Sequence, residues 1–268
     1  MEPGITDEEF ALFQALIHAR AGISLADSKQ VLLVGRLQRR LRHFNLDSFG
    51  EYYRLLVGTQ HPGEMQTMID LVTTNETYFF REPKHFDFLC NEILARREGT
   101  GNFRVWSAAS SSGEEAYTIA MLLAEHLGNL PWEVFGSDVS SQVLEKAMAG
   151  QYPVERSKDI PRSLLSKYCL RGVRSQDGTF IISPAIAQRV SFERINLIHP
   201  IDAGIGDFDV IFIRNVLIYF NPETKRNVLS NLLPRLKKGG FLIVGHSETL
   251  NGIEDRLRQL RPTIYYKP

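Results

Sequence analysis

Apolar residues recur at helical spacing through the first 72 residues of the chain. The clearest stripe lies between residues 27 and 44 and consists of Leu33, Leu37, Leu41 and Phe44. A capping-box sequence at Thr6 marks the start of an earlier helix. Helices are therefore expected at 6–20, 27–44, 47–58 and 62–72, and residues 1–72 are predicted to form an all-helical N-terminal domain.

From residue 102 onward, short apolar runs alternate with amphipathic helical segments. Strands are expected at 103–107, 132–137, 190–195, 208–214, 240–245 and 262–267, and helices at 113–127, 140–148 and 222–236. This alternation predicts an α/β domain over residues 102–268, built on a mostly parallel, doubly wound sheet in which the last two strands could be antiparallel. Ligands of such sheets bind at the carboxyl ends of the strands.

Two segments depart from these periodicities. Residues 73–83 are polar with an embedded aromatic cluster, and they read as neither helix nor strand, so residues 73–101 are predicted to be a linker that forms one wall of a site and then a helix. Residues 150–189 interrupt the strand and helix alternation and contain an Asp177-Gly178 hairpin signal. A small antiparallel β insertion is expected there.

Composition narrows the function classes. The chain has 268 residues, and its 31 Lys and Arg are balanced by 31 Asp and Glu. The protein therefore has no net positive charge that would attract nucleic acid or a membrane surface. The two cysteines, Cys90 and Cys169, are far apart and lack closely spaced histidines, so neither a metal site nor a disulfide is predicted. Without a signal-peptide core or a run long enough to span a bilayer, the protein is expected in the cytoplasm.

One face of the predicted helix at 27–44 is strongly basic, with Lys29, Arg36 and Arg40 on a single stripe. A charged stripe on a surface helix is most often only a solvated face. The alternative is a docking surface for an acidic helical partner. The residues alone leave both interpretations open.

The loop from Ser107 to Gly113 contains only Ser, Ala and Gly, and it joins a predicted strand to a predicted helix. Small side chains let the backbone pass close to a ligand, although tight turns of this composition are also common. The chain has neither a Walker sequence nor a Gly-x-Gly-x-x-Gly sequence, and the loop ends in Glu114 and Glu115. Carboxylates at a helix N-terminus would repel a pyrophosphate but suit a cationic or hydroxyl-bearing ligand.

Asp138 follows the second predicted strand, where α/β folds commonly bind ribose hydroxyls. An aspartate before Val-Ser-Ser is also an ordinary helix cap. The combination of the small-residue loop, Glu115 and Asp138 favours a nucleoside ligand.

Four segments together resemble the bacterial chemotaxis-receptor methyltransferases of the CheR family. These segments are 73–82, 105–115, Phe212 to Phe220 with its Arg214-Asn215 pair, and Gly245-His246-Ser247-Glu248. The resemblance extends over nearly the whole chain, including the helical domain and the β insertion. It implies a Rossmann-like class I methyltransferase fold and a monomeric enzyme that uses S-adenosylmethionine to methylate glutamate side chains of chemoreceptors, without a metal.

The resemblance also implies roles for particular residues. Arg81 and Tyr219 match residues that lie near the transferred methyl group and the incoming carboxylate. The implied cofactor-binding residues are Asn75, Thr77, Arg81, Glu115, Asp138, Asn196, Leu197, Arg214 and Asn215.

Receptor methylation regions in related systems are acidic helical bundles, which gives the basic stripe a partner. The implied docking residues are Lys29, Arg36, Arg39, Arg40 and Arg42. Some family members also hold a receptor C-terminal peptide on the β insertion, and they carry a Gly-x-Gly turn where this chain has Gly172-Val173-Arg174. Two alternatives stay open: methyl transfer to a different acceptor, and a non-catalytic scaffold that binds S-adenosylmethionine.

Overall fold

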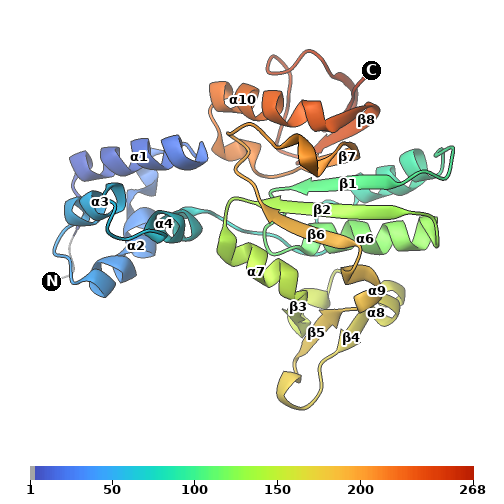
Figure 1. The fold of residues 1–268 in the computed structure, drawn as a ribbon, viewed down its shortest axis with the longest axis horizontal. Helices are drawn as coiled ribbons and strands as arrows, with labels where there is room; N and C mark the ends of the chain where they lie inside the picture. The colour runs from blue at the N-terminus through green and yellow to red at the C-terminus, as the bar shows by residue number, and fades with distance from the viewer. Residues whose placement is uncertain (1–3) are drawn as a thin grey trace.

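A computed structural model describes residues 4–268. The chain forms a helical domain, a central seven-stranded sheet flanked by helices, and a small three-stranded sheet (Figure 1). Two predictions from the sequence involve residues 1–3, namely the start of the N-terminal domain and the lack of a signal peptide. These three residues lie outside the described part of the chain. Among residues 4–268, no helix combines the length and the apolar character needed to cross a membrane.

The four predicted helices of the N-terminal domain are present, and they pack around one apolar core. Thr6 and Glu9 form the predicted capping box, in which each side chain accepts a hydrogen bond from the other residue's backbone amide. The helix bounds are α1 Asp7–Ala21, α2 Gln30–Phe44, α3 Phe49–Val57 and α4 Glu64–Val72, with a short 3-10 turn at Asp27–Lys29 before α2.

The central sheet has the strand order β6-β2-β1-β7-β8-β10-β9. The first five strands pair in parallel, and the last two are antiparallel, so the predicted mostly parallel sheet is confirmed. The bounds are β1 Phe103–Ala108, β2 Trp132–Asp138, β6 Val190–Arg194, β7 Phe208–Ile213, β8 Leu236–Val244, β9 Arg258–Arg261 and β10 Ile264–Tyr266.

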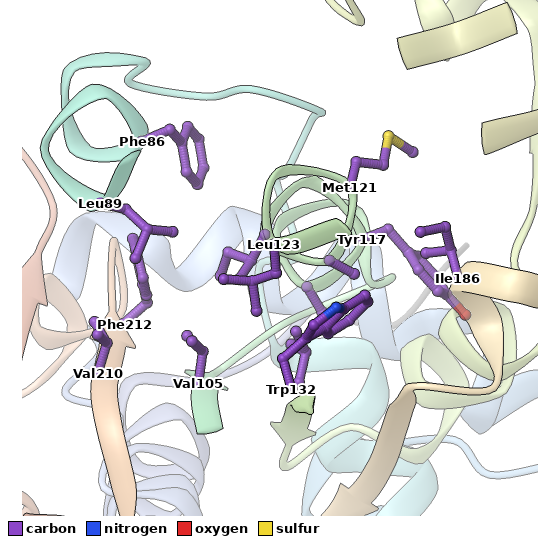
Figure 2. Packing of buried hydrophobic residues seen from close by; sticks show 14 of the residues in the cluster. Phe86, Leu89, Val105, Tyr117, Met121, Leu123, Trp132, Ile186, Val210 and Phe212 are labelled. Carbon is purple, nitrogen blue, oxygen red and sulfur yellow. The ribbon is translucent and has the colours of Figure 1, made fainter. Parts of the chain in front are cut away.

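Alternate residues of the inner strands belong to two separate hydrophobic cores, because successive side chains of a strand point to opposite faces of the sheet. Val105 and Phe212 face α6 and the α5 segment (Figure 2), whereas Trp106 and Ile213 face the core that contains α10. The flanking helices are α5 Lys84–Phe88, which continues as a π-helix over Leu89–Leu94, α6 Glu114–Leu127, α7 Ser141–Ala149 and α10 Pro222–Leu232.

The predicted β insertion is confirmed as a three-stranded antiparallel sheet with the order β3-β5-β4. Tyr152 and Phe180 anchor it to the core beneath α6. Two short helices within it were not predicted from the sequence. The bounds are β3 Gln151–Pro153, α8 Arg162–Tyr168, β4 Cys169–Arg171, β5 Thr179–Ile182 and α9 Pro184–Ala187.

Element boundaries differ from the prediction mainly near the C-terminus. The helix expected at 222–236 ends at Leu232, because Pro234 lies in a following 3-10 turn and cannot continue an α-helix. Strand β8 therefore begins at Leu236 rather than at 240. Strand β9 was missed because all four of its residues are exposed and show no alternation of apolar and polar positions.

The helical domain contacts the sheet domain at the carboxyl ends of the strands. The carboxylate of Asp70 accepts hydrogen bonds from the amide (2.9 Å) and the hydroxyl (2.7 Å) of Ser141, at the start of α7. A carboxylate at a helix N-terminus is favourable there because it satisfies a free amide. A backbone bridge joins Ile23 to Phe220 at the other end of the contact. The seam between the two domains is thus built from specific polar contacts.

Candidate active site

A cavity of about 470 Å³ lies at the seam between the helical domain and the carboxyl ends of the strands. All of the predicted catalytic and cofactor-binding residues line it, although they come from segments far apart in the sequence. These residues are Asn75, Thr77, Arg81, Glu115, Asp138, Asn196, Leu197, Arg214, Asn215 and Tyr219. The structure therefore brings the predicted residues together, and their individual roles stay predictions.

The small-residue loop forms one wall of this cavity. Ala109 and Ser111 adopt left-handed backbone conformations, with φ of 67° and 50°. Asp138 holds the loop in place, because its Oδ2 accepts from the Ser111 amide at 2.9 Å and its Oδ1 accepts from the Ser140 amide at 3.0 Å. Burial raises the pKa of Asp138, and the backbone amides oppose that rise. Each carboxylate oxygen can still accept a second hydrogen bond, so the turn-stabilising and ribose-binding roles are compatible.

Glu115 and Arg214 form the polar centre of the site. Glu115 accepts hydrogen bonds from the Ser107 hydroxyl at 2.6 Å and from Nη1 of Arg214 at 2.9 Å. The other terminal nitrogen of Arg214, Nη2, donates to Glu82 Oε2 at 2.9 Å and to the Arg81 carbonyl at 2.5 Å. Buried Arg214 thus ties the irregular segment 73–83 to the end of β7.

Glu82 and Glu248 support this centre from behind the cavity. Burial opposes the ionisation of Glu82, but Arg214 and Asn215 hold its pKa below the usual range. Glu248 accepts from the amides of Gly245 at 2.6 Å and Asn215 at 2.8 Å, and its burial raises its pKa against those hydrogen bonds. A Cβ at position 245 would lie 2.6 Å from Nδ2 of Asn215, so the close approach of the two loops requires glycine.

Segment 73–83 contributes backbone carbonyls as well as side chains. Nη1 of Arg81 donates to the Glu76 carbonyl at 2.7 Å, and the guanidinium lies 5.7 Å from the centre of the Tyr78 ring. The Asn75 carbonyl accepts from the Ser111 hydroxyl at 3.0 Å, which joins this segment to the small-residue loop. The irregular backbone of segment 73–83 is therefore held from several sides.

Asn196 and Leu197 lie in the loop after β6. The side-chain amide of Asn196 donates to the Arg20 carbonyl at 2.6 Å, so this predicted cofactor residue also fastens the end of α1. Leu197 is buried, and its carbonyl accepts from Nδ2 of Asn231 at 3.1 Å. Both residues are thus fixed in place before any ligand binds.

Family models agree with this arrangement of the two domains. The description "CheR methyltransferase, SAM binding domain" matches residues 75–266, and "CheR methyltransferase, all-alpha domain" matches residues 8–73. The chain belongs to the CheR methyltransferase family. The family and the class of enzyme predicted from the sequence motifs are confirmed.

Curated relatives cover nearly the full length of this CheR-family chain. The chemotaxis protein methyltransferase of Escherichia coli K12 is 43% identical over 97% of this chain and 91% of its own length. The chemotaxis protein methyltransferase 2 of Pseudomonas aeruginosa is 39% identical over 97% and 93%. That of Borreliella burgdorferi is 36% identical over 98% and 95%. This chain therefore contains both parts of a CheR methyltransferase.

The residues of the cavity suit S-adenosylmethionine, the cofactor of this family. The carboxylates of Glu115 and Asp138 match a ligand that carries a positive sulfonium and ribose hydroxyls.

The basic stripe of this CheR protein divides into residues with different environments. Arg36 lines the cavity and donates to the Val72 carbonyl at 2.5 Å and to the Thr74 hydroxyl at 3.0 Å. Arg40 forms a bidentate pair with buried Glu64, with distances of 2.8 and 2.6 Å. Both arginines therefore hold the helical domain together, which the docking prediction did not anticipate.

The other three predicted docking residues, Lys29, Arg39 and Arg42, are exposed. Lys29 also lies at the edge of the cavity. Arg39 and Arg42 thus carry positive charge on the exposed side of α2, and Lys29, in the 3-10 turn before α2, does so at the edge of the cavity.

The predicted list omitted several residues that shape the site. Glu82 and Glu248 lie inside the motifs that carried the resemblance, so the sequence contained a signal for them. Arg156 donates from Nη1 to the Thr77 carbonyl at 2.6 Å, yet no motif surrounds it and it lies in the β insertion. Only the tertiary fold places it at the cofactor site.

The turn that departs from the Gly-x-Gly pattern lies between β4 and β5. Arg174, which replaces the second glycine, has a left-handed backbone with φ of 56°. Gly172 is required locally, because a Cβ there would lie 2.0 Å from the Gln176 carbonyl oxygen. The turn thus keeps a conformation that favours glycine while presenting an arginine side chain.

Proposed function

We propose that this protein transfers methyl groups from S-adenosylmethionine to glutamate side chains of chemoreceptors in the cytoplasm, and thereby sets sensory adaptation. The observation that carries the proposal is a single cavity in which residues of both domains meet. Glu115 and Arg214 come from the sheet domain, and Arg36 comes from α2 of the helical domain. One side of the cavity can hold the methyl donor while the other admits an acceptor side chain.

The chemistry requires little beyond alignment. A free glutamate has a pKa of about 4.3 and is ionised at neutral pH, so no general base is needed. S-adenosylmethionine, when bound, supplies an electrophilic methyl group, and S-adenosylhomocysteine is the product. The protein must hold the acceptor carboxylate in line with that methyl group and exclude water.

Tyr219 is the proposed orienting group for the acceptor. It lies on a short 3-10 helix, Leu217–Tyr219, and its backbone carbonyl accepts from the Ser24 amide at 2.8 Å. A phenol can hydrogen-bond to a carboxylate without neutralising it, which preserves the nucleophile. The hydrogen bond from Arg81 to a backbone carbonyl supports a clamping and positioning role for that arginine.

The acidic helical bundles of receptors are the proposed partner of the exposed basic residues of α2. Charge complementarity would guide docking of the bundle so that a glutamate enters beside Tyr219. The β insertion offers a second surface, because Leu170 and Ile181 are exposed on its sheet. A receptor C-terminal peptide could add a strand there, although the arginine at position 174 departs from the turn of peptide-binding members.

The direct test combines the protein with labelled S-adenosylmethionine and cytoplasmic receptor fragments. The expected product is a base-labile methyl ester on receptor glutamates. Label found only in RNA or in a small metabolite would contradict the proposal. Cofactor binding by calorimetry without methyl transfer to any of several receptors would instead favour a scaffold role.

A further inference from the structure

Three potential metal ligands lie together behind the cofactor cavity. Glu82 and His85 flank the start of α5, and His246 belongs to the loop that follows β8. Their ligand atoms all lie within 4.8 Å of one another. His85 is buried and His246 is exposed, so the cluster extends from the protein interior to its surface.

One hydrogen-bond arrangement around His85 leaves a lone pair at its Nδ1 atom. The hydroxyl of Thr263 donates to the Pro262 carbonyl at 2.5 Å and lies 2.8 Å from Nε2 of His85. When the Thr263 hydroxyl donates to this carbonyl, Nε2 of His85 is the donor to Thr263, and this is the tautomer that a metal ion at Nδ1 requires. A neutral imidazole protonated at Nε2 has a lone pair at Nδ1.

This Nδ1 atom has no hydrogen-bond partner within residues 4–268, and it lies 3.4 Å from Oε2 of Glu82. In the tautomer with a lone pair at Nδ1, this nitrogen and the Glu82 carboxylate are two facing electron-pair donors, and a cation between them would relieve their repulsion. Two ligands bound to one tetrahedral ion at about 2.1 Å each lie roughly 3.4 Å apart. The observed separation of 3.4 Å fits two ligands of one metal ion.

The backbone around the cluster supports a functional role. Glu82 and Thr263 have left-handed conformations, with φ of 59° and 68°. This conformation is unfavourable for both and most of all for a β-branched threonine. Thr263 contacts His85 at Nε2, and metal-bound histidines are commonly held by a hydrogen bond at the ring nitrogen that does not bind the ion.

We propose that Glu82, His85 and His246 form a binding site for a divalent transition-metal ion such as Zn²⁺. Two imidazoles and one carboxylate are a ligand set typical of such ions, and they leave positions open for water. The exposed ring of His246 gives the ion a path from solvent, and its ligand atom lies within 4.8 Å of those of Glu82 and His85. The sequence concealed the site because no cysteine takes part and His246 lies far along the chain from the other two ligands.

The same site is placed to regulate methyl transfer, a consequence that rests on the proposed function. Glu82 Oε2 also accepts from Arg214 Nη2 at 2.9 Å. An ion that binds Glu82 repels the guanidinium of Arg214 and weakens its hold on segment 73–83. Metal binding is therefore expected to lower the affinity for the cofactor.

The test is calorimetric titration of the untagged full chain with Zn²⁺, in the absence of cofactor and receptor. One saturable site is expected. His246→Ala should weaken this site at least tenfold, whereas His246→Cys, which supplies a thiolate ligand, should retain it. His126→Ala removes an exposed histidine of α6 outside the cluster and should leave binding unchanged.

A stoichiometry well below one, or equal Zn²⁺ affinity in wild type and His246→Ala, would overturn the proposal and assign the space between Glu82 and His85 to water. A second titration with S-adenosylhomocysteine tests the regulatory part. Saturating Zn²⁺ should reduce its affinity in wild type and not in His246→Ala. Since neither titration needs a receptor, failure of the metal site and failure of the proposed activity are distinguishable.

Discussion

Arg156 of the β insertion donates a hydrogen bond from Nη1 to the backbone carbonyl of Thr77 at 2.6 Å. The same nitrogen lies 3.7 Å from the buried carboxylate of Glu114. Nearby, the hydroxyl of Tyr152 donates to the Ser112 carbonyl at 2.7 Å. The start of the insertion thus holds both the segment and the loop that line the cofactor cavity, and this links a peripheral subdomain to the active site.

Arg156→Ala is expected to weaken S-adenosylhomocysteine binding about 5- to 30-fold, which corresponds to the loss of about 1 to 2 kcal/mol from one charge-assisted hydrogen bond. Isothermal titration calorimetry measures the change. Arg162→Ala is the matched control, because it removes an exposed arginine from the same insertion. Equal affinity in the two variants would show that Arg156 does not position the cofactor site.

Asp138→Ala should weaken cofactor binding by about 1 to 3 kcal/mol, since the carboxylate organises the Ser111 amide and is the proposed ligand of the ribose hydroxyls. Calorimetry again gives the affinity, and thermal unfolding without cofactor separates binding from folding. The control is Asp202→Ala, which removes an exposed aspartate that accepts from the Gly204 amide at 2.9 Å, outside the cavity. Unchanged affinity in Asp138→Ala would refute the ribose-binding role.

Tyr219→Phe should lower kcat for receptor methylation by about 10- to 100-fold while leaving the cofactor dissociation constant unchanged. The reason is that the lost hydroxyl would orient only the acceptor. Steady-state kinetics with a receptor fragment, combined with cofactor titration, distinguishes the two effects. A parallel loss of cofactor affinity would assign Tyr219 to the donor side instead.

Substitution of two neighbouring arginines of α2 should affect different properties: Arg40→Ala should lower the stability of the protein, and Arg39→Ala should lower its rate of receptor methylation. Arg40→Ala leaves Glu64 buried without its cation and is expected to cost about 2 to 4 kcal/mol of unfolding free energy. Arg39→Ala, at an exposed position, should change stability by less than about 0.5 kcal/mol and slow receptor methylation. Urea unfolding and initial methylation rates test the pair. Normal methylation by Arg39→Ala would remove this residue from the docking surface.

Glu114 makes folding stability depend on pH. It is buried at 1% exposure, and burial raises its pKa against the opposing effects of Ser112 and Arg156. An acid with a raised folded-state pKa binds its proton more tightly in the folded state, so its contribution is greatest below the unfolded pKa and is lost as pH rises through the folded value. Each unit of elevation corresponds to about 1.4 kcal/mol at neutral pH.

Glu114→Gln should therefore gain stability relative to wild type as pH rises from about 4 to about 7. Thermal unfolding at several pH values measures the difference. Glu155→Gln is the control, because its carboxylate lies in the insertion but is exposed. A constant difference between Glu114→Gln and wild type across this range would contradict the expected pKa elevation.

Local sequence patterns determined most of the secondary structure and the family of this protein. Helix α1 was predictable because Thr6 and Glu9 satisfy its first amides by contacts three residues apart. The core strands were predictable because continuous apolar runs have few structural alternatives. Strand β9 was not, because its residues are exposed and its pairing with β10 is a tertiary contact.

The motifs also identified the residues that line the cavity, but tertiary structure decided what each of them contacts. Sequence placed Arg36, Arg39 and Arg40 together on one basic helix, and only packing separated the two that support the domain from the exposed one. The small-residue loop was recognisable by its composition, whereas its attachment to Asp138 and to segment 73–83 depends on the fold. Arg156, and the meeting of His246 with Glu82 and His85, have no local signal, because such contacts exist only after distant segments have packed.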